Sequence, residues 1–353
     1  MKTINKQKTS SVLWILASLV IVLAGIKVAS NIIVPFLMAL FIVIIFKPFA
    51  NALQKKGVPG WLSLAVILLF ILVFIGLLVT MITVSVQNFS DRIPFYNEKL
   101  IIYRDQLIML SQKFGMHIDQ QQLNNFFDPA KIMGFVGIAL KSFSDILSNG
   151  LLILLTIVFI FIESNIFNAK LKFIARDEKK LKYIHEINEQ LNHYMLIKSI
   201  TSASTGIILG GALAIAGIDY ALLWGVVAFM LNYIPSIGSL IAAIPPIILT
   251  LVQFGLPESI AVTLLYVAIN FLIGSVIEPR VMGRGLGLSV LIVFLSLIFW
   301  GWILGPVGMF LSIPITLVIK IILHSQPETR WISIILGNGI ELRSIKRQQL
   351  SNS

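Results

Sequence analysis

The chain has 353 residues, of which 57% are hydrophobic and only 12% are charged. Soluble globular proteins have roughly a quarter of their residues charged, so this composition excludes a water-soluble enzyme. The absence of cysteine also excludes a disulfide-linked secreted scaffold. Apolar runs close to the length of about 20 residues that a spanning helix needs predict an all-α, polytopic helical membrane protein.

Four apolar runs predict membrane spans in the first half of the chain. They cover residues 12–26, 32–46, 61–84 and 151–162. The first run follows three lysines, as in a signal peptide, but no cleavage site precedes a soluble domain, so we interpret it as an uncleaved anchor. Two more polar stretches, 85–148 and 167–198, repeat apolar side chains at spacings of three and four, which predicts amphipathic helices. Such helices serve as scaffolds, oligomer contacts or interfacial helices.

The C-terminal half carries very little charge. Its charged residues between positions 199 and 319 are Asp219, Glu258, Glu278, Arg280 and Arg284. Residues 200–216 and 260–277 predict regular spans, and Gly206-x-x-x-Gly210 predicts close helix packing. Glycine and proline divide the remainder into two hairpin-like pairs of short helices, 222–231 with 240–254 and 288–302 with 309–322. In all, we expect eight to ten membrane elements.

The basic residues are distributed unevenly between the two sides of the predicted membrane. Alternating the spans places 20 of the 27 Lys and Arg on one side and seven on the other. The positive-inside rule assigns the richer side to the cytoplasm, and both termini lie on it. The net charge of +11 is thereby explained by topology, so a nucleic-acid partner, which such a charge favours in a soluble protein, is not expected.

This topology predicts six regions. They are the N-terminal spans (1–84), an extracytoplasmic helical insertion (85–148), a span (149–166), a cytoplasmic amphipathic helix (167–198), a C-terminal membrane region (199–324) and a cytoplasmic tail (325–353).

The first candidate site is the segment 278–284, EPRVMGR, which directly follows a predicted span. Charges near lipid are costly and are usually paired or functional. Glu278 can pair with Arg280 or Arg284, and an arginine fork suits carboxylate, phosphate or polyol oxygens. Gly283 and the proline of this segment break the helix and free backbone groups to face a cavity. The alternative is a topology anchor with arginines that reach towards the membrane surface.

The second candidate site is the segment 232–238, NYIPSIG, between two short helices. Pro235 removes a helical donor and Gly238 permits an irregular backbone. The side chains expected to line a polar site there are Asn232, Tyr233 and Ser236. An ordinary kink between packed helices is the alternative. Asn270, in the middle of the next span, is equally compatible with a hydrogen bond between helices and with a ligand contact.

Other kinds of chemistry are not favoured. Two histidines at the spacing of His185 and His193 can bind zinc with Glu189, but these three lie on the solvated face of their predicted helix. The glycine-rich segment 283–287 lacks the preceding strand that a dinucleotide loop needs. No catalytic triad or pair of carboxylates is visible in the apolar half. We therefore expect no enzyme, no cofactor and no metal site.

A weak internal repeat connects the two broken hairpins. Pro235-x-x-Gly238, followed by Ile244-Pro245, is similar to Pro306-x-Gly308, followed by Ile313-Pro314. The charge assignment turns the first tip to the cytoplasm and the second to the outside. Two similar broken elements of opposite orientation are the expectation for an inverted-repeat carrier with its site at the repeat interface.

The motif segments resemble those of a known family. Residues 231–246, LNYIPSIGSLIAAIPP, resemble the signature of the autoinducer-2 exporters, also called PerM-like permeases. Residues 277–316, from IEPRVMGRGLGLSV to GPVGMFLSIPIT, and residues 32–49 are similar to the TqsA branch of that family. The likeness covers essentially the whole chain and is weakest in 85–148 and after position 325.

The resemblance implies export of autoinducer-2, a small oxygenated furanone-derived signal used in quorum sensing, across the bacterial inner membrane. It further implies a secondary carrier or downhill efflux without ATP, and a homo-oligomer, with a pentamer as the expected state. In our hypothesis Arg280 and Arg284 donate to substrate oxygens, and Glu278 orients them or takes up a coupling proton. The residues expected to line the path are Asn232, Tyr233 and Asn270.

Two other functions remain open. Some family members are similar to sodium/proton antiporters, for which Glu278 is the best membrane-proximal acid in this chain. A membrane scaffold that does not transport, with residues 85–148 bound to an envelope partner, is the second alternative.

Overall fold

The computed structural model describes residues 14, 17, 18, 20–113, 150–174, 178–235, 237–282 and 287–339. Within these ranges the chain is helical, and its only non-helical pairing is an isolated bridge between Leu288 and Gly337. The predicted all-α class is therefore confirmed. The chain divides into two compact units. The first unit contains Met1–Lys47, Leu152–Asn192 and Leu286–Ser353, and the second contains Pro48–Leu151 and His193–Gly285.

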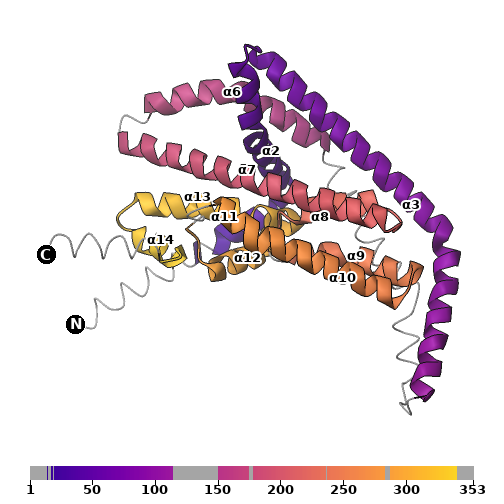
Figure 1. Ribbon diagram of the computed structural model, residues 1–353. Helices are drawn as coiled ribbons and strands as arrows, with labels where there is room; N and C mark the ends of the chain where they lie inside the picture. Colours follow the sequence, from indigo (N-terminus) through magenta and orange to yellow (C-terminus); the bar gives the residue numbers. More distant parts are fainter. Residues whose placement is uncertain are drawn as a thin grey trace, which may run out of the picture. The chain divides into compact units, whose positions relative to one another are not determined.

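Four long helices form the first part of the described chain (Figure 1). They are α2 (Ser30–Lys55), α3 (Gly60–Lys113), α6 (Gly150–Ile174) and α7 (Glu178–Ile215). At 1.5 Å per residue, the 54 residues of α3 extend about 80 Å, far beyond the hydrocarbon core of about 30 Å. The predicted span 61–84 and the start of the predicted insertion are thus one helix. Residues 114–149 of that insertion lie outside the described residues.

Helix α7 likewise joins two predicted regions. Residues 178–198 of the expected cytoplasmic helix and the expected span, 200–216, meet without a break, because no glycine or proline lies between them. Residues 167–174 of that expected helix belong instead to the end of α6. The helix ends where Gly217 and Tyr220 adopt left-handed backbone angles, with φ of 74° and 60°.

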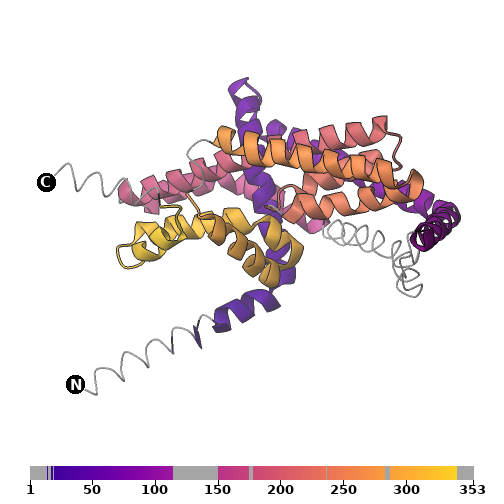
Figure 2. The same ribbon diagram turned by 60° about the horizontal axis from the view of Figure 1, so that its bottom comes forward.

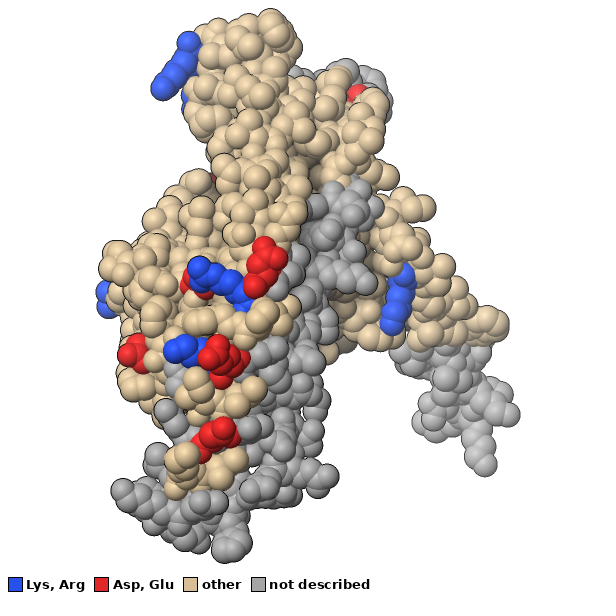
Figure 3. All heavy atoms as spheres, turned by 90° about the vertical axis from the view of Figure 1, so that its right-hand side faces the viewer, with Lys and Arg blue, Asp and Glu red and all other residues tan. Residues whose placement is uncertain are grey.

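Five described helices are long and apolar enough to cross a membrane. They comprise Ser30–Lys55, Gly60–Phe89, Glu189–Ile215, Leu256–Met282 and Val290–Phe310. Shorter apolar helices cover Gly150–Glu163, Ala221–Leu231, Ile237–Gln253 and Ser312–Ser325. Figure 3 shows one face of the molecule, on which charged side chains are few and uncharged residues predominate. The number of spans remains a prediction.

The second unit contains the first predicted hairpin. Helices α8 (Ala221–Leu231) and α9 (Ile237–Gln253) are separate short helices that pack together, as predicted. Helix α10 (Leu256–Asn270) lies beside α9 (Figures 1 and 2). It continues into a π-helix, η1 (Phe271–Ile277), and then α11 (Glu278–Met282).

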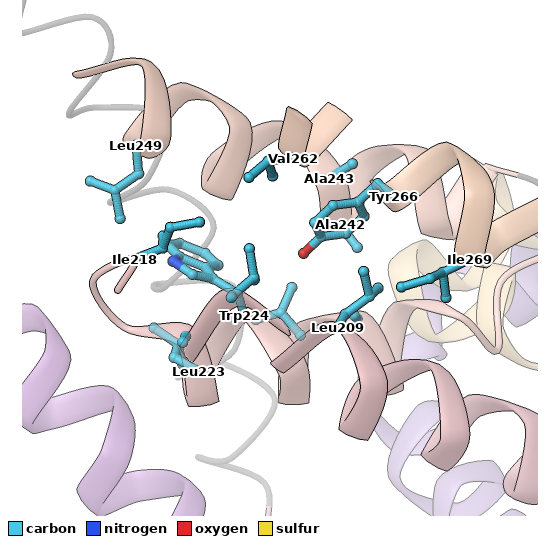
Figure 4. Close-up of a cluster of buried hydrophobic side chains, with 14 of the residues drawn as sticks. Leu209, Ile218, Leu223, Trp224, Ala242, Ala243, Leu249, Val262, Tyr266 and Ile269 are labelled. Atoms are coloured by element: carbon cyan, nitrogen blue, oxygen red, sulfur yellow. The ribbon is translucent and has the colours of Figure 1, made fainter. Parts of the chain in front are cut away.

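An apolar core holds these helices together. Figure 4 shows Leu209 from α7, Trp224 from α8, Ala242 from α9 and Tyr266 from α10 converging in this core. The backbones of α7 and α8 approach closely, because a Cβ atom on Gly206 would lie 2.6 Å from the carbonyl oxygen of Gly225. The predicted close packing at the glycine motif is thereby confirmed.

The first unit contains the second predicted hairpin. Helix α12 (Val290–Phe310) is broken at Gly305, whose backbone has φ of 68° and ψ of −154°, and α13 (Ser312–Ser325) follows. The indole of Trp300 donates to Thr316 Oγ1 at 3.0 Å and ties the two helices together. The short helix α14 (Arg330–Leu336) follows α13 and contacts it.

The two breaks share one local feature. A Cβ atom on Gly238 would lie 1.8 Å from the carbonyl oxygen of Leu231, and one on Gly308 would lie 2.0 Å from that of Trp300. In each case a glycine just after the break presses against a carbonyl of the preceding helix. This is consistent with the internal repeat seen in the sequence, while the opposite orientation of the two hairpins remains a prediction.

Candidate functional site

The second half of α7 carries polar side chains on two neighbouring faces. Lys198, Thr201 and Thr205 recur at spacings of three and four, and Ser199 and Ser202 form a parallel row, so each set shares one side of the helix. All of them except Ser199 are buried. Buried polar groups need hydrogen-bond partners. Thr205 donates to the Thr201 carbonyl of its own helix, whereas Lys198, Ser199 and Ser202 find partners in two other parts of the second unit.

The first partner is Glu278, the first residue of α11. The ammonium group of Lys198 donates to both carboxylate oxygens, at 2.9 and 3.0 Å, and the two side chains are only 7% and 15% exposed. Thr201 Oγ1 lies 3.5 Å from Glu278 Oε2 and donates to the Lys198 carbonyl at 3.2 Å. The buried Lys198–Glu278 ion pair is thus accompanied by the hydroxyl group of Thr201.

Lys198 takes the place that we expected for an arginine. Arg280 is exposed, and Arg284 and Gly283 lie outside the described residues. Residues two positions apart on a helix do not face each other, which is why Arg280 does not reach the carboxylate two residues before it. The ion pair of Glu278 is instead formed with a residue 80 positions away.

A π-helix determines where Glu278 points. The backbone N–H of Glu278 donates to the carbonyl of Ile273, five residues earlier, in place of the usual four. This wider turn rotates the side chains of the following residues, Glu278 included, about the helix axis. Single π turns are frequent at functional sites. Asn270 is half-buried at the end of α10, directly before this turn. Among the described residues its side chain makes no hydrogen bond to the cluster.

The second set of partners comes from the break between α8 and α9. The amide of Asn232 donates to Ser202 Oγ at 3.0 Å, and the hydroxyl of Tyr233 donates to Ser199 Oγ at 2.8 Å. Asn232 and Tyr233 are buried, Pro235 is half-buried, and Ser236 lies outside the described residues.

The close contact of buried Gly238 with Leu231 keeps this break compact. The two predicted segments, 232–238 and 278–284, are therefore brought together on α7. We call the group formed by Lys198, Ser199, Thr201, Ser202, Asn232, Tyr233 and Glu278 the polar cluster.

The α7 members of the polar cluster were not predicted. Lys198 adjoins a basic segment that reads as cytoplasmic, so its burial is not apparent from the sequence. The sequence does contain a signal for this cluster, because Lys198 directly precedes a predicted span whose first residues include hydroxyl side chains at helical spacing. Polar groups inside a predicted span face the protein interior. Chemically, the cluster offers hydroxyl, amide, ammonium and carboxylate groups to a small ligand rich in oxygen.

A second charged group lies just after the C-terminal end of α7, within the same unit. Asp219, in the turn before α8, forms an ion pair with Arg92 of α3 and accepts a hydrogen bond from the hydroxyl of Tyr96 at 2.9 Å. Its backbone N–H donates to the Gln253 side chain at 3.2 Å, and its carbonyl accepts from Trp224 Nε1 at 3.1 Å. Burial, above all, raises the pKa of Tyr96. These contacts fasten α3 to the α7–α8 turn.

Comparison with known proteins gives consistent results. The AI-2E family transporter model matches residues 16–328. A putative transport protein of Haemophilus influenzae is 38% identical over 330 residues, which cover 92% of this chain and 95% of the relative. The AI-2 transport protein TqsA of Escherichia coli is 38% identical over 324 residues, covering 92% and 94%. The putative transport protein YhhT of Escherichia coli is 34% identical over 341 residues, covering 96% and 98%.

Proposed function

Because the chain belongs to the AI-2E family of transporters and is a multi-pass helical membrane protein, we propose that it exports autoinducer-2. The direction is from the cytoplasm across the bacterial inner membrane, with both termini in the cytoplasm. Support for this substrate comes from a relative, 38% identical over almost the whole chain, that is named for AI-2 transport. The resemblance to the family implies a secondary carrier or downhill efflux, and a homo-oligomer with a pentamer as the expected state.

The observation that carries the proposal is the buried Lys198–Glu278 pair. Charges in such a setting are expensive to bury and are kept mostly where they serve ligands or ions. A small oxygenated molecule that leaves water must replace its hydrogen bonds, and the polar cluster supplies both donors and acceptors for this purpose. Arg280, exposed in the same segment as Glu278, and Arg284 are proposed to meet the substrate before it reaches the cluster.

Counterflow of labelled autoinducer-2 in proteoliposomes tests this function. We expect Lys198→Met and Glu278→Gln to reduce the initial rate at least tenfold, and Arg280→Ala and Arg284→Ala to reduce it less. Glu258→Gln is the matched control, because Glu258 is an exposed acid in the first turn of α10, in the same unit. Its rate should equal that of the unmodified protein.

The outcomes of this experiment separate the alternatives. Wild-type rates in correctly folded Lys198→Met and Glu278→Gln would remove the polar cluster from the transport path. If labelled autoinducer-2 does not move but protons move in a sodium-dependent way, the protein is a sodium/proton antiporter and the proposal is wrong. A protein that moves none of these solutes under imposed proton and sodium gradients would be a scaffold.

A further inference from the structure

We propose that the short helix α14 is an interfacial helix whose exposed face binds the anionic headgroup layer of the lipid bilayer. The face consists of Trp331 and Ile335, with Arg330 beside them. It lies outside the polar cluster and outside the five candidate spans, so the transport function does not account for it.

Helix α14 exposes large apolar side chains on one side only. Trp331 and Ile335 are four positions apart and therefore lie on the same side of the helix. They are 60% and 63% exposed. On the opposite side Ser333 is fully buried, and its hydroxyl lies 3.4 Å from His324 Nδ1 of α13. One face of α14 is thus held by α13, and the described residues leave the other face uncovered.

The place of α14 in the chain brings this face to the membrane surface. The preceding helix, α13, is an apolar helix of 14 residues. Only residues 326–329 separate it from α14, which folds back against it (Figure 1). The hydroxyl of Thr329 donates to the Leu323 carbonyl in the last turn of α13, at 2.8 Å. A helix held this tightly to the end of a membrane helix lies at the boundary between lipid and water.

The side chains around the face suit lipid headgroups. Tryptophan is enriched at membrane–water interfaces, where both its apolar ring and its N–H group are accommodated. The exposed guanidinium of Arg330 can donate two parallel hydrogen bonds to a phosphate group. The sequence after α14 adds Arg343, Lys346 and Arg347 against one acid, Glu341. Anionic lipids attract basic segments of this kind.

A second protein chain is a poorer occupant of this face. Stable protein interfaces bury roughly 800 Å² on each partner, whereas the seven residues of α14 extend only about 10 Å. Two exposed side chains on so short a helix cannot by themselves supply an interface of that size. An interfacial helix needs less, because it only places its apolar face about 5–10 Å into the headgroup region.

The lipid contact of α14 also bears on the second hairpin. The backbone N–H of Ser289 donates to the Leu336 carbonyl, and that of Asn338 donates to the Gly287 carbonyl, both at 3.0 Å. The ammonium group of Lys320 donates to the same Gly287 carbonyl at 2.9 Å. Helix α14 therefore connects the end of α13 to the start of α12, so its contact with lipid fixes both helices at the membrane surface.

The absence of cysteine from the chain permits a direct test. A nitroxide spin label is attached to Ile335→Cys in the full-length protein, in vesicles with about one third phosphatidylglycerol. Oxygen concentrates in lipid and a nickel chelate in water, so their collision rates with the label report its depth. We expect oxygen collisions to exceed nickel collisions about threefold or more at Ile335→Cys, and likewise at Trp331→Cys. Glu328→Cys, in the exposed connection before α14, is the control and should show the reverse.

The charge of the headgroups is tested by changing the lipid and Arg330. In vesicles of phosphatidylcholine alone, the inserted fraction of the Ile335→Cys label should fall, because the negative surface potential is missing. With phosphatidylglycerol, Arg330→Gln should lower the ratio of inserted to detached label about fivefold. Lys55→Gln, which removes an exposed positive charge at the end of α2, should leave this ratio unchanged. Equal insertion in the two lipids would overturn the assignment of an anionic partner.

Other occupants of the face give different results. A second copy of the chain would shield the label from both collision partners and broaden its spectrum through spin–spin interaction. Cover by residues 340–353 would shield the label without broadening, and removal of those residues would restore the collisions. A label that meets mainly the nickel chelate faces water. Each of these results would overturn the lipid contact, and none depends on autoinducer-2 counterflow, so the proposed function is tested separately.

Discussion

The predicted span 200–216 of α7 is flanked by two ion pairs, Lys198–Glu278 at its start and Arg92–Asp219 at its end, but the pairs lie in different surroundings. Lys198 and Glu278 are 7% and 15% exposed, whereas Arg92 and Asp219 are 55% and 21% exposed. Both pairs join segments that are distant in sequence, 80 and 127 residues apart. The Lys198–Glu278 ion pair therefore belongs to a buried polar cluster, whereas the Arg92–Asp219 ion pair joins α3 to the α7–α8 turn at the surface.

Burial sets the energetic difference between these pairs. An exposed pair contributes between zero and about 1 kcal/mol, because water and salt screen it and ordering the side chains costs entropy. Removing one member of a buried pair costs about 3–5 kcal/mol, mainly because the other member is left unpaired. Substitutions in the two ion pairs should accordingly differ in how much they lower the free energy of unfolding and in how strongly that loss depends on salt.

The largest effect on stability is expected for Lys198→Met. This substitution leaves the Glu278 carboxylate buried without its ammonium partner, and we expect a loss of about 3–5 kcal/mol in the free energy of unfolding. The measurement is unfolding in detergent micelles followed by tryptophan fluorescence. Because the cost arises from the orphaned charge, the double variant Lys198→Met/Glu278→Gln should recover most of the stability, although not the transport. A double variant as unstable as the single one would show that the pair is not the cause.

Gly238→Ala should have the next largest effect, and only at the buried end. A methyl group would lie 1.8 Å from the Leu231 carbonyl oxygen, so the α8–α9 break must shift and carry Asn232 and Tyr233 away from α7. We expect a loss of about 1–3 kcal/mol, the usual cost of overpacking, together with reduced counterflow. Gly211→Ala on α7 is the control, because nothing lies within 4 Å of the added methyl group. That change should stabilise the helix by about 0.5–1 kcal/mol.

At the exposed end, Arg92→Ala should cost less than about 1 kcal/mol. The Tyr96 hydroxyl and the Gln253 side chain still hold Asp219 in this variant, so the α7–α8 turn should keep its structure. The difference from the unmodified protein should shrink further at high salt, because exposed charges are screened. Chemical unfolding at low and high salt measures this. A loss that exceeds that of Lys198→Met would reverse the comparison between the two ends.

The part of this architecture that depends on local sequence could be predicted. The separation of α8 from α9 follows from Pro235 and Gly238, and the close contact of α7 with α8 follows from Gly206 and Gly210. The break in α12 likewise coincides with Gly305. In each case a residue with special backbone properties marks the feature where it occurs.

The part that depends on distant contacts could not be predicted. Nothing in the spacing of Lys198 identifies a partner 80 residues away, so the neighbouring arginines were the natural candidates for Glu278. The π-helical turn over Phe271–Ile277 has no breaker residue except Gly274, and its apolar sequence is that of an ordinary span. The α7 hydroxyls became recognisable as part of a site only once α8, α9 and α11 were placed against them.

The smallest expected effect concerns the pH dependence of stability at the Asp219 end of α7. Tyr96 is fully buried, and burial together with its hydrogen bonds raises its pKa above the ordinary value of about 10. A group whose pKa is higher in the folded state stabilises that state below the unfolded pKa, and the stabilisation is lost as the pH rises. We therefore expect this stabilisation to be complete and independent of pH near neutrality, and to be lost progressively above about pH 10.

Burial also raises the pKa of the neighbouring Tyr220, so the alkaline loss has two sources at this end of α7. In Tyr96→Phe the slope of stability against pH between about 10 and 11 should decrease, and in Tyr96→Phe/Tyr220→Phe it should decrease further. Tryptophan fluorescence during thermal unfolding at stepped pH measures this slope. An unchanged slope in the double variant would mean that alkaline unfolding begins elsewhere in the molecule and not where α3 is fastened to the α7–α8 turn.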